Sequence, residues 1–133
     1  MSSTTYPAIT ETALAVIERP AIDLVIIRYR PGAVLDEVGI GDVISTCGDL
    51  PGLGVFSMVT VMPVDAEVSM RVLQRDYFTQ LLGEGRIRAL AVVSPNDLFF
   101  QLGTVYFDHH PQPFRIGHFR SEPEGVAWLL DRS

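Results

Sequence analysis

The histidines are the first residues of this sequence that could do chemistry. His109 and His110 are neighbours, they directly follow Asp108, and His118 is the third histidine. Two imidazoles and a carboxylate can bind a transition metal, so Asp108, His109 and His110 are candidate ligands. Adjacent side chains seldom point at one ion, however, and the HExxH spacing of helical zinc sites does not occur. The pattern therefore favours histidines on a surface loop, and a metal enzyme or hydrolase is our third hypothesis.

Nucleophilic catalysis needs a serine or cysteine beside a base, together with donors for an oxyanion. Neither a GxSxG elbow nor a glycine-rich phosphate loop occurs, and Gly52-Leu53-Gly54 precedes a strand-like segment instead of following one. The single cysteine, Cys47, has the usual role of a small buried hydrophobic residue. We therefore predict that the protein is not an enzyme and that it uses no cofactor.

Ser69 precedes a segment with apolar residues at helical spacing, so it is a candidate helix N-cap. It is also a candidate phosphoacceptor, because free backbone N–H groups and the helix dipole stabilise a phosphate there. Asp65 and Glu67 lie within four residues and would repel that phosphate. The plain cap is therefore the favoured interpretation of Ser69, and phosphorylation is the alternative.

Four aromatic residues crowd one predicted helix, which we expect over 96–108. They are Phe99, Phe100, Tyr106 and Phe107. Their spacing places them on more than one face, so some must pack on the sheet while the others form a partner surface or line a pocket. We favour core packing plus a homodimer contact over a pocket for a small apolar ligand.

Strands and helices alternate along the chain. Strands are expected over 12–18, 24–27, 55–62, 87–93 and 114–119, the last one at a sheet edge. Helices are expected over about 40–48, from Ser69 to Gly83 or Gly85, after the Ser94-Pro95 cap, and over 126–130 after a capping box at Ser121–Glu124.

This order predicts an α/β fold with right-handed crossovers. We expect a mixed, mostly parallel sheet of four to five strands with about four helices. Residues 1–11 are expected to be a flexible N-terminus, and residues 12–133 a single domain.

The composition narrows the classes of partner. The chain has 133 residues, 47% of them hydrophobic, and a net charge of −6 with an isoelectric point of about 4.9. An acidic protein with scattered basic residues is disfavoured as a binder of nucleic acid or anionic membranes. No apolar run is long enough to span a membrane, no secretory signal is visible, and a lone cysteine suits a reducing compartment. We therefore expect a soluble cytoplasmic protein.

Three pieces of sequence, taken with the element order, carry a family resemblance. They are Arg75-Asp76-Tyr77-Phe78, Ala89-Leu90-Ala91-Val92-Val93-Ser94, and Pro113-Phe114-Arg115-Ile116 with the terminal Ala127-Trp128-Leu129-Leu130. The chain resembles a group of small bacterial STAS-like proteins, which are related in fold to SpoIIAA-like anti-sigma-factor antagonists and loosely to SEC14 lipid carriers. The resemblance implies a mixed sheet backed by helices that docks a protein or holds a small ligand.

In the anti-sigma-factor antagonists, a phosphorylatable serine stands beside an aspartate at the start of the helix after the third strand. The corresponding segment here lacks that adjacent pair, since Ser69 stands four positions after Asp65. The resemblance therefore gives Ser69 only weak support as a phosphoacceptor.

Three hypotheses of function follow from the sequence. The first is a non-enzymatic STAS-like interaction module, with an unknown protein partner, that self-associates through the third helix or a strand edge. The second is a carrier of a small apolar ligand or lipid, for which the four aromatic residues would supply the pocket. The third is the metal enzyme or hydrolase at the histidines.

Overall fold

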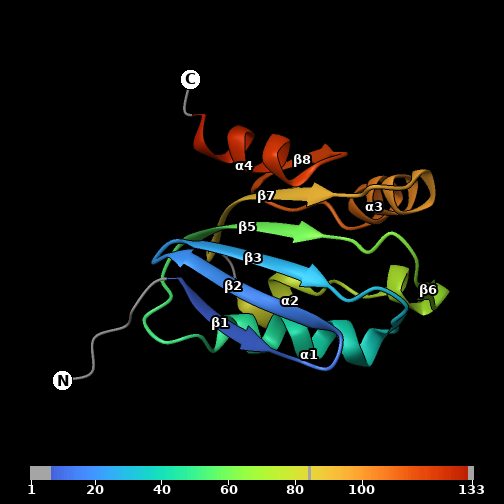
Figure 1. The fold of residues 1–133 in the computed structure, drawn as a ribbon, viewed down its shortest axis with the longest axis horizontal. Helices are drawn as coiled ribbons and strands as arrows, with labels where there is room; N and C mark the ends of the chain where they lie inside the picture. The colour runs from blue at the N-terminus through green and yellow to red at the C-terminus, as the bar shows by residue number, and fades with distance from the viewer. Residues whose placement is uncertain (1–6, 84, 132–133) are drawn as a thin grey trace.

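A six-stranded sheet forms the centre of the structure, a computed structural model that describes residues 7–83 and 85–131 (Figure 1). In spatial order its strands are β1 (Ala8–Glu11), β2 (Ala15–Ala21), β3 (Leu24–Tyr29), β5 (Phe56–Val61), β7 (Ile87–Val93) and β8 (Arg115–Phe119). The first three strands pair antiparallel, and β3, β5, β7 and β8 pair parallel. The predicted α/β class and mixed, mostly parallel sheet are confirmed.

The sheet has six strands where the sequence predicted four to five, and the difference arises at the N-terminal end. The strand expected over 12–18 begins only at Ala15, as β2, and residues 8–11 form the additional strand β1. A turn between Thr12 and Ala15 separates the two strands. In this turn, Thr12 Oγ1 accepts a hydrogen bond from the Ala15 N–H at 3.0 Å, and Thr12 N–H donates to the Ala15 carbonyl at 2.8 Å. Residues 8–11, which were expected to belong to a flexible segment, pair with β2, and residues 1–6 lie outside the described part of the chain.

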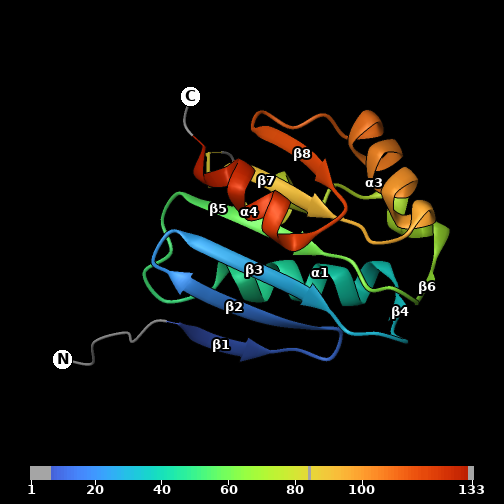
Figure 2. The same ribbon diagram turned by 45° about the horizontal axis from the view of Figure 1, so that its top comes forward.

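Helices lie on both faces of the sheet (Figure 2). Helices α1 (Glu37–Gly48), α2 (Phe78–Leu82) and α3 (Asp97–His109) pack on one face, and α4 (Glu122–Leu130) packs on the other. Each parallel crossover advances by one strand in the same direction, so right-handed connections place the first three helices on one face. A short parallel pair, β4 (Val34–Leu35) with β6 (Glu67–Val68), and the 3₁₀ helix η1 (Met70–Gln74) complete the elements.

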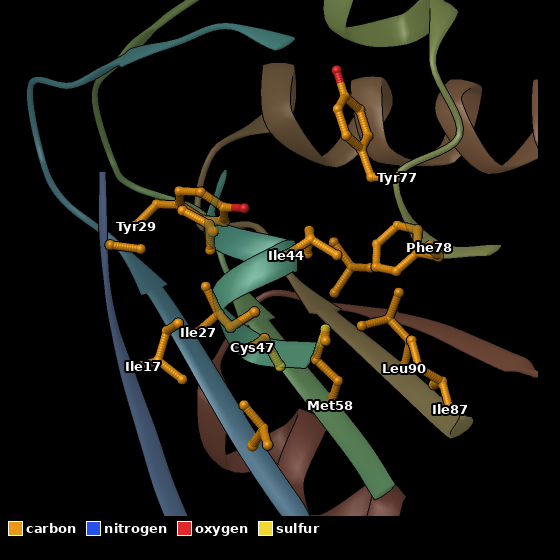
Figure 3. Packing of buried hydrophobic residues seen from close by; sticks show 14 of the residues in the cluster. Ile17, Ile27, Tyr29, Ile44, Cys47, Met58, Tyr77, Phe78, Ile87 and Leu90 are labelled. Carbon is orange, nitrogen blue, oxygen red and sulfur yellow. The ribbon is translucent and has the colours of Figure 1, made fainter. Parts of the chain in front are cut away.

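Two hydrophobic clusters hold these layers together. The larger one lies under α1, α2 and α3 and includes Ile27, Ile44, Met58 and Leu90 (Figure 3). The smaller one lies under α4, where Ile26, Val59, Ala91 and Val93 meet side chains such as Trp128. The buried residues of the parallel strands alternate between the two clusters, as expected for strands covered on both faces.

Helix α4 is also tied to the sheet by an ion-pair network. The guanidinium of Arg28 on β3 donates to both carboxylate oxygens of Glu122 at 2.8 and 2.9 Å, and to Glu18 on β2 at 2.7 Å. Hydrogen bonding to Arg28 lowers the pKa of Glu122, and the two carboxylates raise the pKa of Arg28. This network fixes the first turn of α4 over the antiparallel part of the sheet.

Two helix caps differ from those predicted. The residue that caps α3 is Asn96, whose Oδ1 accepts from the Phe99 N–H at 2.8 Å, and not Ser94, which is buried at the end of β7. At α4, the Ser121 hydroxyl donates to the Glu124 carboxylate at 2.8 Å, and Ser121 Oγ accepts no hydrogen bond from a backbone N–H of the first turn. Helix α3 begins within one residue of the predicted place, whereas α4 begins at Glu122, directly after the predicted cap at Ser121 and four residues before the expected start at Val126.

Candidate functional site

An apolar pocket of about 110 Å³ lies between the sheet and the helices of the α1–α3 face. Its floor is formed by Tyr29, Thr60, Leu90 and Val92, from β3, β5 and β7. Most of these residues lie in the later half of their strands, which is the edge where ligands bind in open α/β sheets.

The pocket exists because the crossover between β5 and β7 contains too short a helix. Helices α1 and α3 stand over opposite parts of the sheet, and the space between them must be filled by α2. Five residues of helix are only about 7.5 Å long, whereas a seven-residue strand such as β7 extends about 23 Å. Since α2 leads directly into the start of β7, it covers the sheet at the amino end of that strand. The carboxyl end is covered by η1 instead.

The segment that roofs the pocket corrects one sequence prediction. A single helix from Ser69 to Gly83 was expected, but the chain forms η1, breaks at Arg75–Tyr77, and then forms α2. Arg75 has an extended backbone with φ −118° and ψ 137°, and the Asp76 carboxylate accepts from the N–H groups of Phe78 and Thr79 to start α2. The apolar periodicity of this segment is real, but hydrogen bonds from α3 stabilise the break.

Those hydrogen bonds come from the side chain of Tyr106 on α3 and from that of His110, the C-cap residue of α3. The Tyr106 hydroxyl donates to the Arg75 carbonyl at 2.7 Å and accepts from the Tyr77 N–H at 3.1 Å. His110 Nε2 lies 2.8 Å from the Leu73 carbonyl, an acceptor to which it donates. The Tyr106 and His110 rings also pack against each other with centroids 4.8 Å apart. Tyr106 and His110 therefore hold η1 and the Tyr77 segment over the pocket.

Three of the four aromatic residues singled out in the sequence line this pocket. Phe99 and Tyr106 are buried, and Phe107 is half-buried beside them. Phe100 lies outside it, between the Arg120 guanidinium, 4.2 Å from its ring centroid, and the His118 ring. On α3 the large apolar side chains that remain exposed are Leu98 and Val105.

The histidines and Asp108 are not brought together at a common point. Asp108 and His109 are exposed at the end of α3, His110 is bound to Leu73, and His118 faces α3 from β8. Across residues 7–83 and 85–131, no three His, Cys, Asp or Glu side chains form a group that could hold a metal ion. Burial lowers the pKa of His118.

Ser69 stands at the N-terminus of η1 and not of an α-helix. Its hydroxyl oxygen accepts from the Arg71 N–H at 3.4 Å, and its own N–H donates to the Leu35 carbonyl at 2.9 Å. The residue is half-buried. The structure thus gives Ser69 a local capping contact, and its phosphorylation stays a prediction.

The pocket wall is almost entirely apolar, and its polar groups are hydroxyls. The buried Thr60 Oγ1 and Tyr77 Oη have no hydrogen-bond partner in the described part of the chain, and neither does the Tyr29 hydroxyl. Burial raises the pKa of Tyr29 above its ordinary value and that of Tyr77 to about 12, so both phenols are neutral. Among the described residues, no charged side chain lines the pocket.

Three buried groups with possible chemistry, Cys47, Ser94 and His118, lie outside the pocket wall. Cys47 is fully buried in α1, and this burial raises the pKa of its thiol to about 12. The Ser94 hydroxyl and His118 Nδ1 are buried, and neither has a hydrogen-bond partner within the residues that the structure describes. The pocket can therefore bind a molecule by shape and by hydroxyl contacts.

Sequence reasoning identified the aromatic wall but missed the floor and the roof. Thr60 is a polar residue within the otherwise apolar strand β5, and Tyr29 ends the neighbouring strand β3. Polar residues at inward-facing strand positions were therefore the available signal. The roof residues Val72 and Leu73 gave no such signal, because their place depends on the contact with α3.

No helix within the described ranges is both long and apolar enough to cross a lipid bilayer.

Comparison with known proteins identifies the fold. No protein-family model and no curated protein matches the chain. A solved structure that does match is an uncharacterised protein of the DUF3478 family with a SpoIIAA-like fold from Shewanella loihica PV-4. The two chains share 15% identity with a TM-score of 0.55, and the match covers 97% of this chain and 98% of the other. The protein therefore has the SpoIIAA-like, or STAS-like, fold that its sequence resembles.

Proposed function

We propose that this protein is a non-enzymatic binding module that takes up a small apolar molecule in the pocket between the sheet and helices α1 and α3. The observation that carries the proposal is the apolar pocket itself, which lies at the carboxyl end of the parallel strands. Protein interiors are normally packed without such spaces, because each void removes dispersion contacts from the atoms around it. A pocket of this size therefore lowers stability unless a ligand fills it.

The volume restricts the ligand to the size of one small ring or a short branched chain. An apolar cavity of about 150 Å³ accepts benzene, whereas sites for drug-sized ligands occupy about 300–1,000 Å³. At about 110 Å³, the pocket is close in size to the benzene cavity and too small for a drug-sized ligand. Between the two forms of the carrier hypothesis, the volume favours a small apolar ligand over a lipid of the SEC14 type.

A protein-interaction role is the second candidate, and one surface observation favours it. Several large apolar side chains are more than half exposed on segments that follow the parallel strands: Val34, Val38, Val64, Met70 and Leu98. We call these five residues the apolar rim. Exposed apolar side chains on neighbouring segments are a common feature of protein-binding surfaces. Because β4 and η1 supply residues to both the rim and the pocket wall, ligand binding and partner binding would be coupled there.

The lack of enzymatic activity and the cytoplasmic location belong to this proposal as well. The burial of Cys47, which raises the pKa of its thiol to about 12, supports the first, and the presence of a single cysteine supports the second. Retained small molecules in native mass spectra of the purified protein, and no zinc binding by calorimetry, are the results expected.

The proposal is tested by titrating toluene into the protein and recording amide chemical shifts by NMR. We expect saturable shifts for pocket residues such as Leu90, Val92 and Phe99. The variant Val72→Trp should abolish them, because Val72 lies in the roof and a larger side chain there fills the pocket.

The matched control is Val38→Trp, since Val38 is 74% exposed on α1 and does not line the pocket. This variant should bind toluene as the wild type does. Absence of saturable shifts in the wild type, or an equal loss in both variants, would refute the pocket as the binding site.

A further inference from the structure

The floor of the pocket carries two hydroxyl side chains on neighbouring strands. Ile27 on β3 pairs with Thr60 on β5, and Tyr29, two residues after Ile27, projects from the same face of the sheet. Tyr29 and Thr60 therefore occupy diagonal positions on the floor, and both line the pocket. Figure 3 shows the Tyr29 hydroxyl pointing into the cluster, toward the side where Ile44 and Tyr77 lie.

Neither hydroxyl has a hydrogen-bond partner within residues 7–83 and 85–131. Thr60 Oγ1 is fully buried, whereas the Tyr29 hydroxyl keeps some accessible surface on a side chain that is only 7% exposed. Buried polar groups without a partner are rare, because burying them costs the hydrogen bonds that they made with water. The nearby Tyr106 hydroxyl, which makes two hydrogen bonds, shows how a buried tyrosine of this pocket is satisfied when the protein supplies the partners.

The chemistry of the wall defines what could satisfy them. A charged ligand would be buried without a counter-charge, because no charged side chain lines the pocket in the described chain. A single water could fill part of the pocket of about 110 Å³, but it would leave the apolar remainder without contacts. A molecule with an apolar body and one hydroxyl or carbonyl group meets both requirements, because a hydroxyl side chain can donate and accept.

We infer that the pocket selects a small neutral molecule with one hydrogen-bonding group, and that Tyr29 and Thr60 on its floor bind that group. This inference rests on the proposed function and names the class of ligand for the same pocket.

Phenol and toluene are the probes that separate binding by the pocket from binding by the floor hydroxyls. The two molecules have the same ring, which carries a hydroxyl group in phenol and a methyl group in toluene. Toluene affinity measures the pocket, and the ratio of the phenol and toluene affinities measures the floor hydroxyls. Phenol buried without a partner should bind at least about tenfold more weakly than toluene. We expect the wild type to bind phenol at least as tightly as toluene, measured by calorimetry.

Isosteric variants then locate the contact. Tyr29→Phe should weaken phenol binding about tenfold and leave toluene binding unchanged within about twofold, and Thr60→Val should act in the same direction. Thr104→Val is the control, because its hydroxyl donates to the Phe100 carbonyl on the exposed side of α3; it should change neither affinity.

The outcomes distinguish this inference from the proposed function. Toluene binding with phenol about tenfold weaker in the wild type overturns the inference and leaves the pocket as a binding site. Equal effects of Tyr29→Phe and Thr60→Val on both ligands also overturn it. If the wild type binds neither ligand, both the inference and the proposed function are wrong.

Discussion

At the scale of single residues, two tyrosines of the pocket wall differ in one respect that can be measured. The hydroxyl of Tyr106 makes two buried hydrogen bonds to the backbone of Arg75 and Tyr77, whereas the hydroxyl of Tyr77 has no partner in the described chain. Replacement by phenylalanine removes the same atom in each case. The difference in stability between the two variants therefore reports the hydrogen bonds and not the loss of a hydroxyl in general.

We predict that Tyr106→Phe lowers the free energy of unfolding by about 2 kcal/mol, because it leaves a backbone donor and a backbone acceptor unpaired. Tyr77→Phe should change the stability of the ligand-free protein by less than about 0.5 kcal/mol or raise it. Urea denaturation of both variants checks this prediction. A Tyr77→Phe variant as unstable as Tyr106→Phe would show that the Tyr77 hydroxyl is satisfied in solution.

The pair formed by Arg28 and Glu122 predicts a dependence of stability on pH. Hydrogen bonding to Arg28 lowers the pKa of Glu122 in the folded protein, so the ionised pair stabilises the fold above the ordinary glutamate pKa of 4.5. That contribution is lost as the pH falls below 4.5 and through the lowered pKa. Both side chains are about one-third exposed, so the effect should be no more than about 1 kcal/mol.

The variant Glu122→Gln should accordingly be less stable than the wild type at pH 7, and the difference should shrink as the pH falls below 4.5. Thermal unfolding measured between pH 3 and pH 7 tests this. A difference that stays constant over this range would mean that the charge of Glu122 plays no part in holding α4 to the sheet.

At the scale of elements, helix α3 contains a glycine where the pocket needs room. A Cβ added at Gly103 would lie 3.6 Å from Val92 Cγ1 and 3.7 Å from His118, which are ordinary contacts. Since alanine is the better helix former, Gly103→Ala should raise stability by about 0.5–1 kcal/mol. Gly103 lines the pocket, so the added methyl group should also weaken toluene binding.

The same substitution on the opposite face is the control. At Gly125 in α4, a Cβ would lie 3.1 Å from Val93 Cγ2 and 3.2 Å from Ala91 Cβ, which is too close without a shift of the helix. Gly125→Ala should therefore lower stability and leave toluene binding intact. Urea denaturation and ligand titration of both variants provide the test, and equal effects on stability would contradict the packing described for the two faces.

The elements also show why some of the structure could be predicted from sequence and some could not. Strand β7 was expected over 87–93 and is found there, because its apolar residues, interrupted only by Arg88, are bounded by Gly85 and Pro95. The N-terminus of α3 was also predicted to within one residue, because the local Ser94-Pro95 pair marks the start of a helix. The break between η1 and α2 was missed, since it is stabilised by Tyr106 and His110, about 30 residues later in the chain.

The pocket, too, could be predicted only in part from the sequence. Its aromatic wall was visible as a cluster on one predicted helix, and the alternative of a ligand pocket followed from it. Its existence depends on α2 being five residues long, and therefore on the same long-range hydrogen bonds. Thr60 and Tyr29 carried no local sign of a missing partner, because a partner is a property of the folded chain.

At the scale of the whole molecule, self-association stays a prediction. Strands β1 and β8 are the two edges of the sheet, and α3 exposes few large apolar side chains, so a strand edge or the apolar rim is the contact that we propose. Light scattering should give twice the chain mass of 14.7 kDa at high concentration. The monomer mass over the whole concentration range would contradict the homodimer and leave the pocket unaffected.

The proposed function requires that the space beneath η1 admits a small apolar molecule. A crystal structure determined with toluene present tests it directly. We predict electron density for one ring above Thr60, Leu90 and Val92, between Ile44 and Phe99, with η1 in its present place. Side chains that close this space, with no ring bound between the sheet and η1, would contradict the claim.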